Sequence, residues 1–199
     1  MRKKLITAII ALSLALCCLV GVTMAWLMDS TPTVKNTFTT GDVEITLKES
    51  PLNADGTYGT PVEGTENAYQ MIPGTEYKKD PTVAVDASSE TCYLFVKFEE
   101  EGDASTYLTY TSTLTSTNGW TQGDGTNIPS NVWYRIVEKG DSVRSWALLA
   151  GNKITVNATT VTKANMDIAA KAALVYTAYA VQKANVVDAA AAWVIVNGN

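Results

Sequence analysis

The residue types that most often perform chemistry are scarce in this sequence. Its 199 residues include no histidine, which excludes Ser-His-Asp and Cys-His catalysis and every zinc site with a histidine ligand. Cys92 is the only cysteine after the first 25 residues. It lies in the apolar stretch Cys92–Val96, where we expect it to pack as a small buried side chain. We therefore predict no catalytic, cofactor-binding or metal-binding residues, and no enzyme activity.

Carboxylates and tryptophans leave two other kinds of chemistry open. Acidic residues number 20, and two carboxylates can hydrolyse a glycosidic bond, but no pattern in the sequence pairs them. The acidic run Glu99–Asp103 either binds calcium or forms a solvated loop. Trp120 or Trp133 could stack on sugar rings if exposed, although Trp133 stands in a strand pattern that favours the core.

The charge of the chain excludes one class of partner. The full sequence carries a net charge of −5, and three of its 15 basic residues precede Ala25 whereas all 20 acidic residues follow it. A chain without residues 1–25 would be more acidic still. Nucleic-acid binding requires clustered Lys and Arg side chains that contact phosphates, so we predict no nucleic-acid partner.

The N-terminus has the three parts of a secretory signal peptide. Arg2, Lys3 and Lys4 precede an apolar run of 18 residues, Leu5–Val22. Thr23 and Ala25 then provide the small residues that signal peptidase requires at positions −3 and −1. We predict cleavage between Ala25 and Trp26, secretion to the extracellular matrix or cell surface, and membrane contact only through residues 1–25.

Two alternatives to a cleaved signal remain open. The apolar run is barely long enough to span a bilayer, so residues 1–25 could be kept as an anchor. Lipid attachment at Cys17 or Cys18 is the other alternative, but neither cysteine follows the small residue that this modification requires.

Many short strands with Gly, Pro and Asn between them predict an all-β fold, an antiparallel β-sandwich with one or two short helices over residues 41–199. Thr91–Phe98 is apolar on both faces, as expected of a central strand. The stretch from Glu76 to Val85 is interrupted at Pro81 and is expected at an edge or a bulge. Met71–Gly74 predicts a turn. The other predicted strands are Val43–Lys48, Thr106–Thr117, Asn131–Glu138, Lys153–Thr159 and Leu174–Gln182, and the predicted helices are Thr162–Ala172, with Thr162 as N-cap, and Val186–Val196.

Several stretches together resemble TasA/camelysin-type secreted proteins. The N-terminal matches are Ala25–Asp29 and Asn36–Val43, and the others are Met71–Gly74, Lys79–Val83, Cys92–Lys97 and Tyr176–Gln182. The resemblance implies a jelly-roll β-sandwich from a Gram-positive bacterium, with a signal peptide cut by a SipW-type signal peptidase.

The resemblance also implies a function as a structural subunit of extracellular or biofilm matrix fibres, a homo-oligomer. In such fibres the mature N-terminal strand of one subunit inserts into the next. Carried over to this sequence, residues 26–40 form the donor strand, with side chains Trp26, Leu27, Met28, Val34 and Phe38. Alternatively, these residues fold back onto their own sheet, or the chain is a cell-surface adhesin or carbohydrate-binding module. The metallopeptidase activity described for camelysin relatives does not transfer, because the His-Glu-x-x-His motif is absent.

Overall fold

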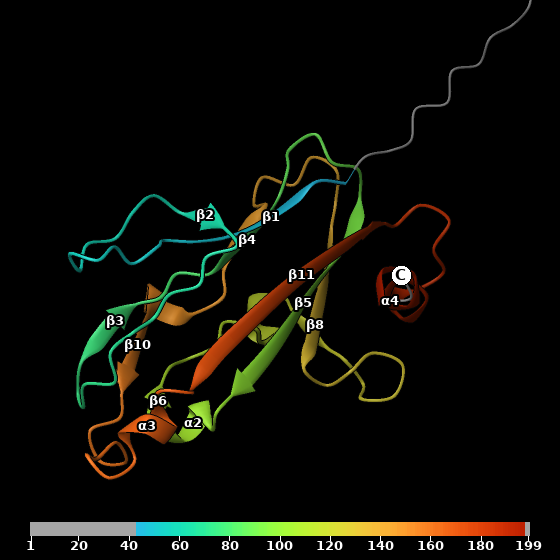
Figure 1. Cartoon of the computed structure of the whole chain (residues 1–199). Helices are drawn as coiled ribbons and strands as arrows, with labels where there is room; N and C mark the ends of the chain where they lie inside the picture. The colour runs from blue at the N-terminus through green and yellow to red at the C-terminus, as the bar shows by residue number, and fades with distance from the viewer. Residues whose placement is uncertain (1–42, 198–199) are drawn as a thin grey trace, which may run out of the picture. The chain divides into compact units, whose positions relative to one another are not determined.

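Two ten-residue strands, β5 (Cys92–Glu101) and β11 (Ala173–Gln182), form the centre of the structure (Figure 1). The computed structural model describes residues 43–197. The two strands are antiparallel and paired along their whole length, from Cys92 opposite Gln182 to Glu101 opposite Ala173. The other strands of this sheet are β8 (Val132–Val137) and β7 (Thr121–Gln122), in the order β11-β5-β8-β7.

Two smaller antiparallel sheets complete the β structure. One sheet has the order β2-β1-β4-β9 and the other has the order β3-β10-β6. The first consists of β2 (Val62–Glu63), β1 (Ile45–Glu49), β4 (Thr82–Val85) and β9 (Ser145–Ala147). The second consists of β3 (Glu76–Lys78), β10 (Lys153–Val156) and β6 (Leu108–Thr109).

The helices are short and lie between or outside the strands. Two α-helices have four residues each, α2 (Ala104–Tyr107) and α3 (Met166–Ala169). Two 3₁₀ helices cover Ser116–Asn118 and Ala150–Asn152. The nine-residue helix α4 (Ala189–Asn197) packs on β11 and β5.

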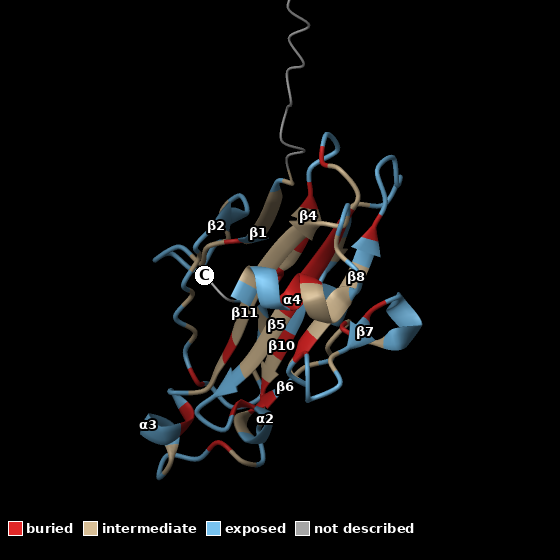
Figure 2. Ribbon diagram, turned by 90° about the vertical axis from the view of Figure 1, so that its right-hand side faces the viewer, coloured by how far each residue is buried: buried red, intermediate tan, exposed pale blue. Residues whose placement is uncertain are grey.

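Alternation along β5 divides its side chains between two apolar clusters. Leu94 and Val96 point to an inner face, where they meet Val83 and Val85 of β4. Tyr93 and Phe95 point to the outer face, which α4 covers with Trp193 (Figure 2). Because β5 is buried on both faces, it is apolar at successive positions rather than at alternate ones. The prediction of a central strand at Thr91–Phe98 is confirmed.

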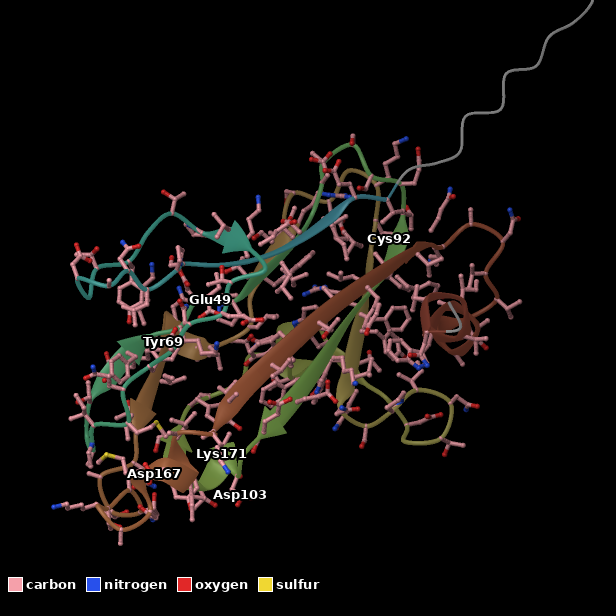
Figure 3. The ribbon with its side chains drawn as sticks, in the orientation of Figure 1. Glu49, Tyr69, Cys92, Asp103, Asp167 and Lys171 are labelled. Carbon is pink, nitrogen blue, oxygen red and sulfur yellow. The ribbon has the colours of Figure 1, made fainter. Side chains whose placement is uncertain are left out.

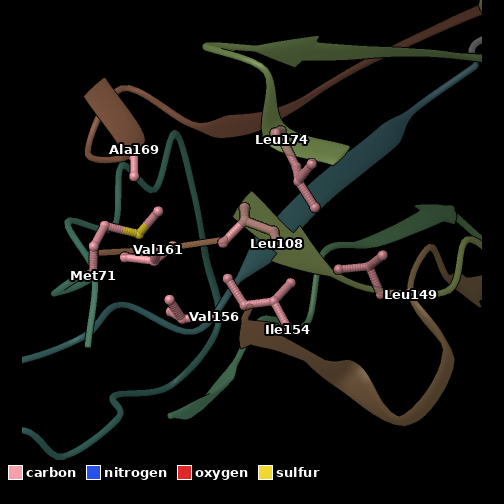
Figure 4. Packing of buried hydrophobic residues seen from close by; sticks show 9 residues of the cluster. Met71, Leu108, Leu149, Ile154, Val156, Val161, Ala169 and Leu174 are labelled. Atoms are coloured by element: carbon pink, nitrogen blue, oxygen red, sulfur yellow. The ribbon is translucent and has the colours of Figure 1, made fainter. Parts of the chain in front are cut away.

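A third apolar cluster fills the space near the start of β11. Leu174 of β11 meets Leu108 of β6 and Ile154 of β10, and Met71 and Val161 close the cluster (Figure 4). This cluster joins the third sheet to the central pair of strands. The all-β class and the sandwich-like packing of antiparallel sheets therefore agree with the sequence prediction.

A close backbone approach fixes the turn at the end of β5. Gly102 has φ +57°, and a Cβ atom built on it would lie 2.3 Å from the carbonyl oxygen of Lys171. Only glycine tolerates both this conformation and this contact. The turn brings Asp103 and Lys171 to the same end of the molecule, beside α2 and α3 (Figure 3).

Three predicted elements need correction. The stretch from Glu76 to Val85 is divided at Pro81, as predicted, but its halves join different sheets. The first half, β3, lies at an edge as predicted, whereas β4 lies inside its sheet. Thr106–Thr117 is largely not a strand, because its first residues complete α2 and only Leu108–Thr109 pair with β10. The predicted helix Thr162–Ala172 shrinks to α3, whose N-cap residue is Asn165 and not Thr162.

Several other predictions are confirmed within a few residues. The turn at Met71–Gly74 has Gly74 at φ +78°. The remaining agreements are β1, β8, β10, β11 and α4, at or near the residues expected.

Candidate functional site

A pocket of about 530 Å³ opens where β1 passes the beginning of β11. Its walls are the end of β1, the segment Gly64–Tyr69 and the residues Ala172–Tyr176. The apolar part of the lining includes Leu108, Ile154 and Leu174, which belong to the cluster shown in Figure 4. We refer to this cavity as the β1–β11 pocket.

The outer edge of β11 adjoins this pocket. Within residues 43–197, β11 pairs with β5 alone, and β1 approaches it without joining its sheet. A strand at the end of a sheet presents backbone N–H and C=O groups that can pair with another strand. Residues 43–197 therefore combine an unpaired strand edge with a partly apolar cavity beside it.

Tyr176 lines the pocket, and its hydroxyl is a buried polar group. Its ring stacks on Phe98 with ring centroids 5.0 Å apart, and its hydroxyl is buried with no hydrogen-bond partner in the described structure. Burial is the main cause that raises the pKa of Tyr176 above its usual range, so the hydroxyl keeps its proton. A buried donor without a partner is destabilising.

Glu49 is the centre of a polar cluster in the wall of the pocket. Its Oε2 lies 3.1 Å from Nζ of Lys79, and both side chains are almost buried. Its Oε1 accepts a hydrogen bond from Nδ2 of Asn67 at 3.1 Å and lies 3.0 Å from the hydroxyl of Tyr69. Figure 3 places Glu49 and Tyr69 next to each other, far from Cys92. We call Glu49, Asn67, Tyr69 and Lys79 the Glu49 cluster.

A second polar group lies directly behind this cluster. The backbone N–H and hydroxyl of Ser50 donate to the Asp80 carboxylate at 2.8 and 2.7 Å, and Lys78 Nζ lies 3.0 Å from the same carboxylate. Desolvation raises the pKa of Asp80, but the hydrogen bonds from Ser50 and the charge of Lys78 outweigh it and lower the pKa. These contacts hold the end of β1 to the residues that precede β4.

The residues predicted for signal cleavage and strand donation lie outside the described residues. These are Thr23, Ala25 and Trp26 for cleavage and Trp26, Leu27, Met28, Val34 and Phe38 for donation. Cys92 is fully buried, as predicted from its apolar surroundings. Desolvation raises the pKa of its thiol to about 11, so it is a poor nucleophile at neutral pH.

The structure also places the acidic run and the two tryptophans. Trp133 lies in β8, is half-buried and packs against the inner apolar cluster, as its strand pattern predicted. Glu99–Glu101 are the last residues of β5, and Glu100 accepts a hydrogen bond from the hydroxyl of Tyr110. In residues 43–197, no group of three or more acidic or cysteine side chains is arranged to hold a metal ion. Trp120 is 2 % exposed and packs edge-to-face on Trp146, so its ring offers no surface for a sugar.

Searches among known proteins add no identity to this geometry. No family model, curated protein or solved structure matches the chain. Among the described residues, no helix combines the length and the apolar character needed to cross a membrane.

The sequence analysis missed the Glu49 cluster. Its members come from β1, from the loop before β3 and from the link between β3 and β4. The one local signal was the charged pair Lys79–Asp80 between two strand patterns, where solvated turn residues are expected. Nothing in the sequence indicated that Asn67 would meet either residue.

Proposed function

We propose that this chain is a secreted structural subunit of extracellular matrix fibres, and that its subunits join by strand donation. In this proposal, cleavage after Ala25 by a SipW-type signal peptidase frees residues 26–40. These residues then add to the β11 edge of the next copy, beside the β1–β11 pocket. A jelly-roll topology for residues 41–199 belongs to the same proposal.

The observation that carries the proposal is the edge of β11, which no strand of residues 43–197 covers, next to a partly apolar pocket. Strand addition uses such an edge for main-chain hydrogen bonds and uses pockets for alternate side chains. Each subunit donates one strand and accepts another, which generates a filament and not a closed dimer.

The sequence of residues 26–40 fits such an occupant. Trp26, Met28, Val34 and Phe38 occupy even-numbered positions, so an extended chain places them on one face. Burial of three or four such side chains offers roughly 6–10 kcal/mol before the cost of ordering the strand. Pro32 lacks an N–H donor and separates the two apolar pairs.

Fibre formation by a chain that begins at Trp26 tests the proposal. We expect filaments in negative-stain electron micrographs of this chain and monomers from a chain that begins after Thr40. Monomers from both, after long incubation at high concentration, would refute spontaneous self-assembly and favour a surface-binding module instead.

Two variants with complementary defects, one in the donor strand and one in the acceptor edge, test where the donor strand binds. The double variant Val34→Asp/Phe38→Asp disables the donor, and Ala173→Trp places a bulky ring at the start of β11 beside the pocket, where it obstructs the acceptor edge. Each chain alone should stay monomeric, whereas a mixture should form dimers that do not extend. Gln122→Trp is the matched control, because it places the same bulky ring on β7 at the opposite edge of the same sheet. Loss of fibres with the control variant would argue against β11 as the acceptor.

A further inference from the structure

The Glu49 cluster contains an amine, a primary amide and a carboxylate in mutual contact. Glu49 lies 3.1 Å from Lys79 through Oε2 and 3.3 Å through Oε1. The same Oε1 accepts a hydrogen bond from Nδ2 of Asn67. The Glu49 carboxylate therefore contacts Nζ of Lys79, a potential nucleophile, and Nδ2 of Asn67, a potential leaving group.

We propose that Lys79 and Asn67 join through an intramolecular isopeptide bond, with Glu49 as the group that moves the protons. The proposal is independent of fibre formation, because it concerns a covalent bond within one chain. It assigns a chemical role to a buried ion pair that the proposed fibre contact does not require.

Little solvent reaches the pair of Lys79 and Glu49. Lys79 and Glu49 have side chains that are only 11 % and 12 % exposed, and the ring of Tyr69 lies 5.9 Å from Nζ of Lys79. The direct contact between Nζ of Lys79 and the Glu49 carboxylate allows a proton to pass between them without a bridging water. Transfer of one proton from Lys79 to Glu49 leaves an amine that can attack a carbonyl carbon.

The amide of Asn67 is held in an orientation that supports attack. Its Oδ1 accepts a hydrogen bond from the backbone N–H of Leu52 at 2.7 Å, which would stabilise negative charge on that oxygen in a tetrahedral intermediate. Its Nδ2 also donates to the carbonyl oxygen of Ser50 at 2.9 Å. These contacts fix Asn67, while the side-chain torsions of Lys79 let its amine move from Glu49 to the amide carbon.

The reaction balances without any further reactant. Nζ of Lys79 forms a bond to Cγ of Asn67, and the bond from Cγ to Nδ2 breaks. The two protons that Nζ loses pass through Glu49 to the departing Nδ2, which leaves as ammonium. One amide replaces another, so no oxidant or reductant is consumed, and Glu49 is regenerated as a carboxylate. The bond closes a loop around the Met71–Gly74 turn.

Mass spectrometry of the purified full chain tests this bond. We expect the region to be lighter than its sequence mass by one ammonia molecule. Trypsin should fail to cut after Lys79 and should release residues 49–78 and 79–97 as one branched product. A wild-type chain that yields separate 49–78 and 80–97 peptides at their sequence masses would overturn the proposal. This result needs no variant and so does not depend on whether variants fold.

Substitutions separate the bond from a cyclised asparagine, which also loses ammonia. Lys79→Arg and Glu49→Gln should restore the sequence mass, whereas Lys78→Arg, at the neighbouring lysine, should keep the branched product. Loss of ammonia that persists in Lys79→Arg would mean cyclisation of Asn67 and would refute the bond. Fibres without the bond would refute the isopeptide proposal and support the fibre proposal. The bond without fibres would have the opposite meaning.

Discussion

The two ends of the β5–β11 pair differ in how completely their side chains are packed. At the closed end, near Cys92 and Gln182, the outer face lies under α4, and Phe95, Tyr179 and Trp193 form one aromatic group. At the pocket end, near Glu101 and Ala173, an ion pair, an unpaired hydroxyl and an open strand edge adjoin a cavity. The closed end is therefore expected to contribute most to stability, and the pocket end is where both proposals lie.

The largest effect is expected at the closed end. Trp193 is 5 % exposed and contacts the rings of Phe95 and Tyr179, with centroids 5.3 and 5.5 Å away. Trp193→Ala should lower the free energy of unfolding by about 3–5 kcal/mol, as measured by urea denaturation with circular dichroism. The matched control is Val194→Ala, because Val194 is 67 % exposed on the same helix, and it should change stability by less than about 0.5 kcal/mol. Equal effects would mean that α4 does not pack on the sheet.

Packing at the closed end should also protect the Cys92 thiol from alkylation. Desolvation raises the pKa of Cys92 from 9.0 to about 11, which lowers the thiolate fraction at pH 8 by about 100-fold. Alkylation by iodoacetamide should therefore be at least about 100-fold slower in the folded chain than in urea. Similar rates in both conditions would show that this end opens readily.

Acid is expected to destabilise the pocket end by protonating the Asp80 carboxylate. Its pKa is lowered in the folded state, so the ionised form stabilises the fold above the unfolded pKa of about 3.9, and this stabilisation is lost as the pH falls through the folded pKa. Asp80→Asn should cost about 1–3 kcal/mol at pH 7, and its difference from wild type should shrink below pH ~4. Urea denaturation at several pH values measures this, with Asp167→Asn at an exposed position of α3 as the control. A difference that stays constant with pH would contradict the assignment.

The smallest effect is expected from the unpaired hydroxyl. Tyr176→Phe removes a buried donor without a partner, so the unfolding free energy should stay within about 1 kcal/mol of wild type or rise slightly. The comparison is Tyr69→Phe, which removes a hydroxyl that contacts Glu49 and Asn67 and should cost about 1–3 kcal/mol. A large loss from Tyr176→Phe would mean that its hydroxyl has a partner in solution.

The closed end was predictable from the sequence, because its signals are local. A strand that is apolar on both faces, such as β5, must lie between two packed layers, and β11 is rich in β-branched and aromatic residues. The alanine-rich run before Asn197 predicted α4 through its helix propensity. The burial of Cys92 could be predicted from the apolar residues beside it in the sequence.

The pocket end was not predictable, because it depends on contacts between distant segments. Pro81 correctly indicated an interruption, but the sequence could not place β3 and β4 in different sheets. Thr-rich residues after Thr106 have β propensity, yet the chain turns into α2 there because Gly102 and Asp103 adopt positive φ angles. Glu49, Asn67 and Lys79 meet only after three separate segments have packed.

The pairing of β5 with β11 has a consequence for how the chain folds as it is made. Synthesis proceeds from the N-terminus at about 5–20 residues per second, and Cys92 cannot pair with Gln182 until that late residue exists. Folding that depends on such distant partners is slow, so the nascent chain has no complete central sheet until nearly all of it has been synthesised. If the chain is secreted as proposed, it would therefore remain unfolded, and able to cross the membrane, until its last strand has been synthesised.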